Sequence, residues 1–190
     1  MASDRVLTVP NLLSLVRLVL AIVLFVVMER GAWAPATWLF VVAASTDWVD
    51  GWYARRFGQV SRLGRIFDPL VDKVIVCGAY VLLAERDGAS AIAPWMAVVV
   101  IVRELIVTAV RAEMERIGQD FSAGLIGKLK MVLQCLAIGM ELAARAWPDV
   151  SLGGIALRPA ANVVAWAAIV ATVWSGLEYL LRCRVLIRSP

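Results

Sequence analysis

Four aspartates at regular spacing are the residues of this 190-residue chain best suited to chemistry. Asp47 and Asp50 are three positions apart, and Asp68 and Asp72 are four apart, so each pair shares one face of a helix. The surrounding residues are apolar enough to enter a bilayer, where an ionised side chain is costly and indicates a functional site. Four carboxylates in one cleft would need cations between them. The spacing therefore predicts a site for hard divalent metal.

The residues that follow the first two aspartates favour a bound ligand. Gly51 and Ala54 each follow an aspartate by four positions, so the face that carries the carboxylates is otherwise without bulk. Small residues in membrane helices also serve helix packing, and for Gly51 both interpretations stay open. Arg55 offers a planar group suited to a diphosphate or a nucleotide base.

The composition predicts an all-α integral membrane protein. Hydrophobic residues make up 62% of the chain and charged residues only 18%, which is far more apolar than a soluble domain. Apolar runs of about the length that a spanning helix needs lie at residues 11–28, 34–53, 66–84, 91–112, 123–145 and 160–181. We therefore expect six transmembrane helices in a single domain, residues 1–190.

The basic residues predict the orientation of these helices. Six crossings put both termini on one side, and most basic residues outside the spans fall on that side. The opposite side has only Arg30, Arg86, Arg145 and Arg158. By the positive-inside rule, we expect a multi-pass protein of the cell membrane with both termini in the cytoplasm.

The composition also excludes several kinds of site. The chain has no His, which excludes Ser-His-Asp triads and His-ligated zinc. Cys77, Cys135 and Cys183 are far apart in sequence and form no CxxC pattern. Although the net charge is +4, the basic residues gather at the predicted cytoplasmic face, so lipids and phosphorylated substrates are expected partners and nucleic acid is not.

The complete spacing, Asp-x2-Asp-Gly-x2-Ala-Arg-x8-Gly-x3-Asp-x3-Asp from Asp47 to Asp72, resembles the signature of the CDP-alcohol phosphotransferase family. These are integral membrane enzymes of phospholipid synthesis. The resemblance implies two ions, Mg2+ or Mn2+, held by Asp47, Asp50, Asp68 and Asp72, with Asp72 also as general base. It implies contacts to the CDP-lipid from Gly51, Ala54, Arg55, Ser61 and Gly64, and from the stretch Asn11, Leu12, Leu13 and Ser14.

The resemblance also implies the reaction. In such enzymes CDP-diacylglycerol binds in a cleft open to the cytoplasm, an acceptor hydroxyl attacks the phosphorus on the lipid side, and CMP leaves. A second set of residues looks like that of the members that use sn-glycerol 3-phosphate and make phosphatidylglycerophosphate: Arg103, Arg111, Lys128 and Lys130. They could bind the acceptor phosphate, although Arg111 and Lys130 could equally be ordinary positive-inside charges.

Other functions stay open at this point. Within the family, a cardiolipin synthase would use phosphatidylglycerol as acceptor, and another member would use inositol phosphate. A cation transporter is the alternative from a different class, but it would leave Gly51, Ala54 and Arg55 without a purpose. Members of the family are often dimers, so the resemblance also allows a homodimer, for which the sequence supplies no independent evidence.

Overall fold

The computed structural model describes residues 9–57, 64–84, 90–116 and 124–188, which form six helices and one short hairpin. The helices are α1 (Val9–Glu29), α2 (Trp33–Phe57), α3 (Gly64–Leu83), α4 (Pro94–Arg116), α5 (Leu125–Ala146) and α6 (Leu157–Arg188). Each lies within a few residues of a predicted apolar run, except that α6 continues seven residues past its run. The prediction of six helices is confirmed.

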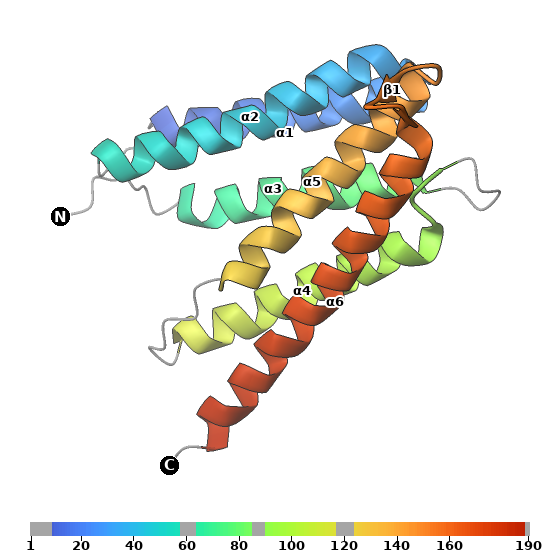
Figure 1. The fold of residues 1–190 in the computed structure, drawn as a ribbon. Coiled ribbons are helices and arrows are strands. Elements are labelled where there is room, and N and C mark those ends of the chain that lie inside the picture. Colours follow the sequence, from blue (N-terminus) through green and yellow to red (C-terminus); the bar gives the residue numbers. More distant parts are fainter. Residues whose placement is uncertain (1–8, 58–63, 85–89, 117–123, 189–190) are drawn as a thin grey trace.

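The helices alternate in direction, so their ends gather at two opposite ends of the bundle (Figure 1). One end, here called the motif end, holds the start of α1, the end of α2, the start of α3 and the start of α5. The other, the hairpin end, holds the short connections from α1 to α2 and from α5 to α6. In the picture α1 and α2 form one layer, α3 and α5 the next, and α4 and α6 the last. The aspartate motif thus belongs to one end of the molecule.

Each helix turns a narrow apolar stripe toward the centre of the bundle. In α3 the buried residues are Val71, Ile75, Ala79, Tyr80 and Leu83, which lie on one side of the helix. The most extensive contact joins α5 and α6, where small side chains such as Ala137, Ala161, Ala165 and Ala168 are buried. Small residues let membrane helices approach closely, and this close packing replaces the hydrophobic effect that lipid cannot supply.

Gly78 permits the closest of these approaches. A Cβ atom added there would lie 2.2 Å from the ring of Phe25 in α1, which no real contact allows. The absence of a side chain therefore sets the distance between α1 and α3. Both helices begin at the motif end and run away from it, so this contact between Phe25 and Gly78 lies toward the hairpin end.

A two-stranded hairpin between α5 and α6 was not expected from the sequence. Strand β1 (Ser151–Leu152) pairs antiparallel with β2 (Ile155–Ala156), and Gly153 and Gly154 between them have φ angles of 59° and 84°. Two central residues with positive φ suit the right-handed twist of a tight hairpin, and glycine adopts them without strain. The Gly-Gly pair was the signal in the sequence.

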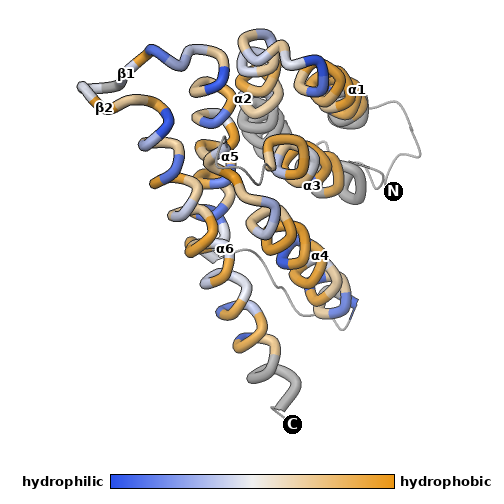
Figure 2. Tube along the Cα trace, turned by 90° about the vertical axis from the view of Figure 1, so that its right-hand side faces the viewer, coloured by the Kyte–Doolittle hydropathy of each residue, from blue (hydrophilic) through white to orange (hydrophobic). Residues whose placement is uncertain are grey.

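Apolar residues dominate the helices, as Figure 2 shows. Judged by length and composition over the described residues, one helix is suited to cross a membrane, the segment Leu157–Cys183 of α6. α4 and α5 are helical at the predicted places but carry charged residues, among them Arg103, Glu104, Lys130 and Glu141. The six crossings therefore stay a prediction. They require that the charged residues within α4 and α5 be paired.

Glu141 is the most deeply buried of these charges. Its carboxylate is fully buried and accepts hydrogen bonds from Arg145 (2.8 Å), Arg158 (2.7 Å to each oxygen) and the backbone N–H of Ala91 (3.0 Å). Arg145 also donates to the carbonyl of Leu83 at 3.0 Å. These contacts join α5, the start of α6 and the chain between α3 and α4 at the hairpin end.

The Glu141 cluster generates a prediction about stability. Glu141→Gln would leave the buried Arg145 and the partly exposed Arg158 without a full counter-charge, and breaking a buried pair typically costs about 3–5 kcal/mol. We expect a clear fall in Tm of the purified protein in detergent. Glu113→Gln, which removes a carboxylate paired with Arg116 at the exposed end of α4, is the matched control and should change Tm little. Equal Tm values for the two variants would contradict a clamping role for Glu141.

Candidate active site

The motif aspartates lie on two helices that meet at the motif end. Asp47 and Asp50 are in the last turns of α2, and Asp68 and Asp72 are in the first turns of α3. The structure describes their backbone and not their side chains. Just before them, the hydroxyls of Ser45 and Thr46 donate to the backbone carbonyls of Val41 and Val42 at 2.7 and 2.8 Å.

The predicted contacts to the CDP-lipid lie at the same end. Gly51, Ala54 and Arg55 continue α2, Gly64 begins α3, and the stretch from Asn11 to Ser14 lies in the first turns of α1. As with the aspartates, only their backbone is described. Ser61 falls in 58–63, outside the described residues. The helices thus put most of the predicted donors at one end, and their side-chain contacts stay a prediction.

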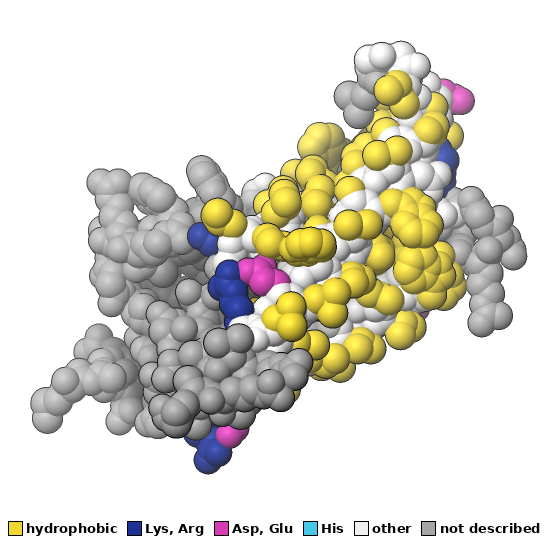
Figure 3. Space-filling model, turned by 60° about the horizontal axis from the view of Figure 1, so that its bottom comes forward, with side chains coloured by type: hydrophobic (Ala, Val, Ile, Leu, Met, Phe, Trp, Pro, Cys, Tyr) yellow, Lys and Arg dark blue, Asp and Glu magenta, His cyan; other side chains and the backbone are white. Residues whose placement is uncertain are grey.

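Beside these helix ends, the described residues enclose a pocket of about 160 Å³ between α3, α4, α5 and α6. Arg103, Arg111 and Lys130, predicted to bind the acceptor phosphate, all line it, and so does Lys73 of α3. Figure 3 shows basic and acidic side chains gathered in a patch next to a broad apolar surface. A charged pocket at the edge of an apolar face suits a reaction between a water-soluble molecule and a lipid.

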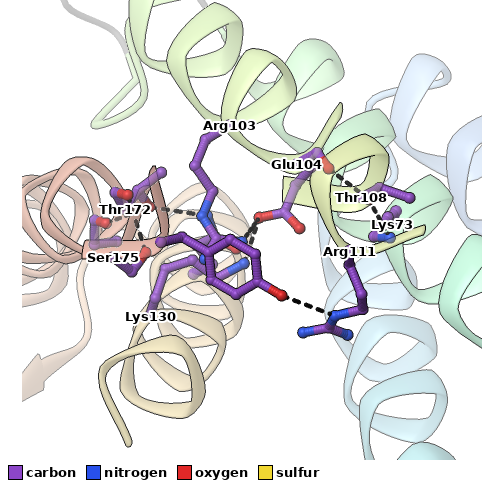
Figure 4. Close-up of polar contacts among 11 residues, drawn as sticks. Lys73, Arg103, Glu104, Thr108, Arg111, Lys130, Thr172 and Ser175 are labelled. Carbon is purple, nitrogen blue, oxygen red and sulfur yellow. Dashed lines mark hydrogen bonds and ion pairs between the residues drawn. The ribbon is translucent and has the colours of Figure 1, made fainter. Parts of the chain in front are cut away.

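Glu104 is the anion at the centre of the pocket. Its Oε1 accepts hydrogen bonds from Lys130 and, at 3.2 Å, from Arg103. All three side chains are at least 88% buried, since their exposed fractions are 10%, 7% and 12%. Figure 4 shows the two cations reaching the carboxylate from α4 and α5. In an apolar bundle such pairing lets the charges be buried.

Lys73 and Arg111 are held differently. The Lys73 ammonium donates to the hydroxyl of Thr108 at 2.5 Å, and Arg111 Nε donates to the hydroxyl of Tyr179 at 3.3 Å. Both partners are neutral. Thr108 in turn donates to the backbone carbonyl of Glu104 at 2.6 Å, which leaves its oxygen free to accept from Lys73.

Residues of α6 complete the pocket, and the sequence did not point to them. Ser175, Glu178, Tyr179 and Arg182 line it, and Arg182 is paired with Glu178. Gly176 lets α6 approach, because a Cβ there would lie 3.3 Å from the side chain of Arg103. The only sequence signal was the spacing of Ser175, Glu178, Tyr179 and Arg182 on one helical face of an otherwise apolar segment.

Two basic residues near the pocket face the solvent instead. Lys128 is exposed and is not among the residues that line the pocket, so its predicted role in acceptor binding stays a prediction. Arg116 at the end of α4 is 74% exposed and donates to Glu113 at 2.7 and 3.0 Å. This hydrogen bond lowers the pKa of the Glu113 carboxyl.

Comparison with known proteins identifies the family to which this site belongs. A model of the CDP-alcohol phosphatidyltransferase family matches residues 7–174, which include the whole aspartate motif and most of the pocket. The chain belongs to the CDP-alcohol phosphatidyltransferase family. The resemblance inferred from the aspartate spacing is confirmed. CDP-alcohol phosphatidyltransferases are membrane-bound, metal-dependent enzymes, and this chain is an enzyme of phospholipid synthesis.

Several curated relatives carry one and the same name. The chain is 38% identical over 185 residues to the CDP-diacylglycerol–glycerol-3-phosphate 3-phosphatidyltransferase of Salmonella choleraesuis, which covers 93% of this chain and 94% of the relative. It is 37% identical over 189 residues to the protein of that name from Escherichia coli, with the same coverage. The namesake from Bacillus subtilis is 37% identical over 141 residues, or 74% of this chain and 69% of the relative.

Proposed function

We propose that this CDP-alcohol phosphatidyltransferase transfers the phosphatidyl group of CDP-diacylglycerol to sn-glycerol 3-phosphate. The products are phosphatidylglycerophosphate and CMP. The cationic pocket beside the motif helices supports this acceptor, because a phosphorylated molecule needs positive charge in a place otherwise lined by apolar helices. The relatives named for the same reaction support it independently.

The four aspartates suit a pair of Mg2+ or Mn2+ ions. Two carboxylates on one face of α2 and two on one face of α3, at the same end of the bundle, are a donor set of hard oxygens that such ions prefer. When bound, the metals would hold the diphosphate and stabilise the charge that develops during transfer. Asp47, Asp50, Asp68 and Asp72 are the proposed ligands.

The remaining steps fall to groups of this chain. Gly51 and Ala54 leave space for the CDP group along α2, with Arg55, Ser61, Gly64 and the residues from Asn11 to Ser14 as further proposed contacts. The acceptor hydroxyl passes its proton to Asp72 as its oxygen bonds to the lipid-side phosphorus. The bond from that phosphorus to the oxygen of CMP breaks, and CMP leaves with the electron pair.

Six crossings with the motif end toward the cytoplasm fit the distribution of charge. Two of the basic residues at the hairpin end, Arg145 and Arg158, share the carboxylate of Glu141, which offsets one of their two positive charges. Trp95 and Trp166 pack against each other there, with ring centroids 5.5 Å apart, as expected of aromatic residues at a membrane interface. A homodimer stays a prediction.

The first test of this proposal concerns the metals. CMP release from CDP-diacylglycerol should require Mg2+ or Mn2+, and Asp47→Asn or Asp68→Asn should nearly abolish it because each removes a proposed ligand. Asp149→Asn, which changes an exposed aspartate at the hairpin end, is the matched control and should keep full activity. Substantial turnover after exhaustive chelation would refute the metal proposal.

The orientation can be tested by labelling. In a background in which Cys77, Cys135 and Cys183 are replaced by alanine, Arg116→Cys should react with an impermeant thiol reagent only from the cytoplasmic side. Ser151→Cys, in the hairpin, should react only from outside. Both positions are exposed in the structure. The reverse pattern would show that the orientation is wrong.

The acceptor can be tested with purified enzyme in detergent. With CDP-diacylglycerol as donor, sn-glycerol 3-phosphate should support CMP release and yield phosphatidylglycerophosphate, because it brings a phosphate to the cationic pocket. Phosphatidylglycerol and inositol phosphate, offered at the same concentration, should be poor acceptors. Efficient use of phosphatidylglycerol with no use of glycerol 3-phosphate would identify a cardiolipin synthase instead.

A further inference from the structure

The charges in the pocket divide into those that are already neutralised and those that are not. Five cations line the pocket, Lys73, Arg103, Arg111, Lys130 and Arg182, with two carboxylates, Glu104 and Glu178. Glu178 pairs with Arg182. Glu104 pairs with both Arg103 and Lys130, so that buried group of three keeps one net positive charge. An anion that bound to Arg103 or Lys130 would have to approach the Glu104 carboxylate and its like charge.

No hydrogen bond or ion pair joins Lys73 or Arg111 to the Glu104 carboxylate, although its charge also acts on Lys73. Among the described residues neither is in an ion pair, and each is held by a hydroxyl. Among the described residues, no other partner takes the remaining two N–H donors of Lys73 or the four N–H donors on the terminal nitrogens of Arg111. Their charges are close enough to act on each other. Two cations in one pocket that have no ion-pair partner in the described part of the chain are suited to a phosphate, which at neutral pH carries nearly two negative charges.

The helices bring these two cations to the same place. Thr108, which holds Lys73, and Arg111 are three residues apart and so lie on one face of α4, where side chains are about 5–6 Å apart at Cβ. Figure 4 shows Lys73 next to Thr108 with Arg111 beside them, and Glu104 between this group and Lys130. Arg111 donates its Nε–H to the Tyr179 hydroxyl, which fixes the plane of the guanidinium. Its two terminal nitrogens then remain for a ligand.

We propose, on the basis of the proposed function, that the acceptor phosphate binds between Lys73 and Arg111. Tyr179 of α6 is then a positioning residue that orients Arg111. Arg103 and Lys130 hold Glu104 and shape the pocket without taking the phosphate themselves. Because Lys73 directly follows Asp72 in α3, this arrangement anchors the acceptor next to the residue proposed to receive its proton.

Steady-state kinetics of the purified enzyme test this assignment. Lys73→Gln and Arg111→Gln should each lower kcat/KM for sn-glycerol 3-phosphate by about 10- to 150-fold, as expected for the loss of a hydrogen bond to a charged group, with KM for CDP-diacylglycerol little changed. Lys73→Arg, which keeps the charge, should restore part of the loss. Arg116→Gln removes an exposed charge five residues further along α4 and should behave like wild type.

Tyr179→Phe tests the positioning role, since it removes the hydroxyl and keeps the ring. Losing one neutral partner of Arg111 should raise KM for glycerol 3-phosphate about 2- to 10-fold and leave kcat unchanged. A purely structural role would instead lower Tm without this selective change in KM. For any variant too slow to assay, the rise in Tm on adding glycerol 3-phosphate reports binding directly, and for Lys73→Gln and Arg111→Gln it should be lost.

Two failures can be told apart. If the wild-type enzyme releases no CMP with glycerol 3-phosphate, the proposed function itself is wrong. If the wild type uses glycerol 3-phosphate, but Lys73→Gln and Arg111→Gln keep its KM while folded Arg103→Gln or Lys130→Gln raises it, the phosphate binds at the Glu104 group and the present assignment is overturned.

Discussion

An ionised side chain inside an apolar helix bundle must find a counter-charge or a ligand, because lipid and packed apolar residues cannot solvate it. Glu141 and Glu104, both in the interior, meet that constraint with counter-charges. Each draws two basic residues from different helices, and in doing so each fixes how those helices sit against one another.

The two ends of the molecule differ in how fully their buried charged side chains are paired. At the hairpin end, both oxygens of Glu141 are occupied by two arginines and a backbone N–H, and the cluster clamps the helices. At the motif end, pairing is incomplete, because Lys73 and Arg111 have only hydroxyl partners among the described residues. A saturated cluster stabilises the bundle, whereas an unsaturated one can accept a charged substrate. This difference is the physical basis for assigning structure to one end and chemistry to the other.

Close packing makes both clusters feasible. Where helices approach each other through glycine or alanine, long polar side chains from neighbouring helices can reach one another across the contact. Gly176 brings α6 against the stem of Arg103, and Gly78 brings α1 against α3 through Phe25. Buried hydroxyls and amides add to the same effect, as when Gln134 of α5 donates to Thr172 of α6 at 2.9 Å. The polar contacts then bind helices that have no hydrophobic reason to associate within lipid.

The sequence by itself determined the features that depend on local spacing. The aspartate motif from Asp47 to Asp72 identified the family. The apolar runs located the six helices that the structure describes, because the length and apolar character of a helix depend on consecutive residues. Arg103, Arg111 and Lys130 were also recognised as a basic group. The tertiary structure decided which distant residues meet: it added Lys73, Tyr179 and Arg182 to the pocket, left Lys128 outside its lining, and paired Glu141 with Arg158. These outcomes depend on the rotation and separation of packed helices, which a residue's neighbours in the chain do not specify.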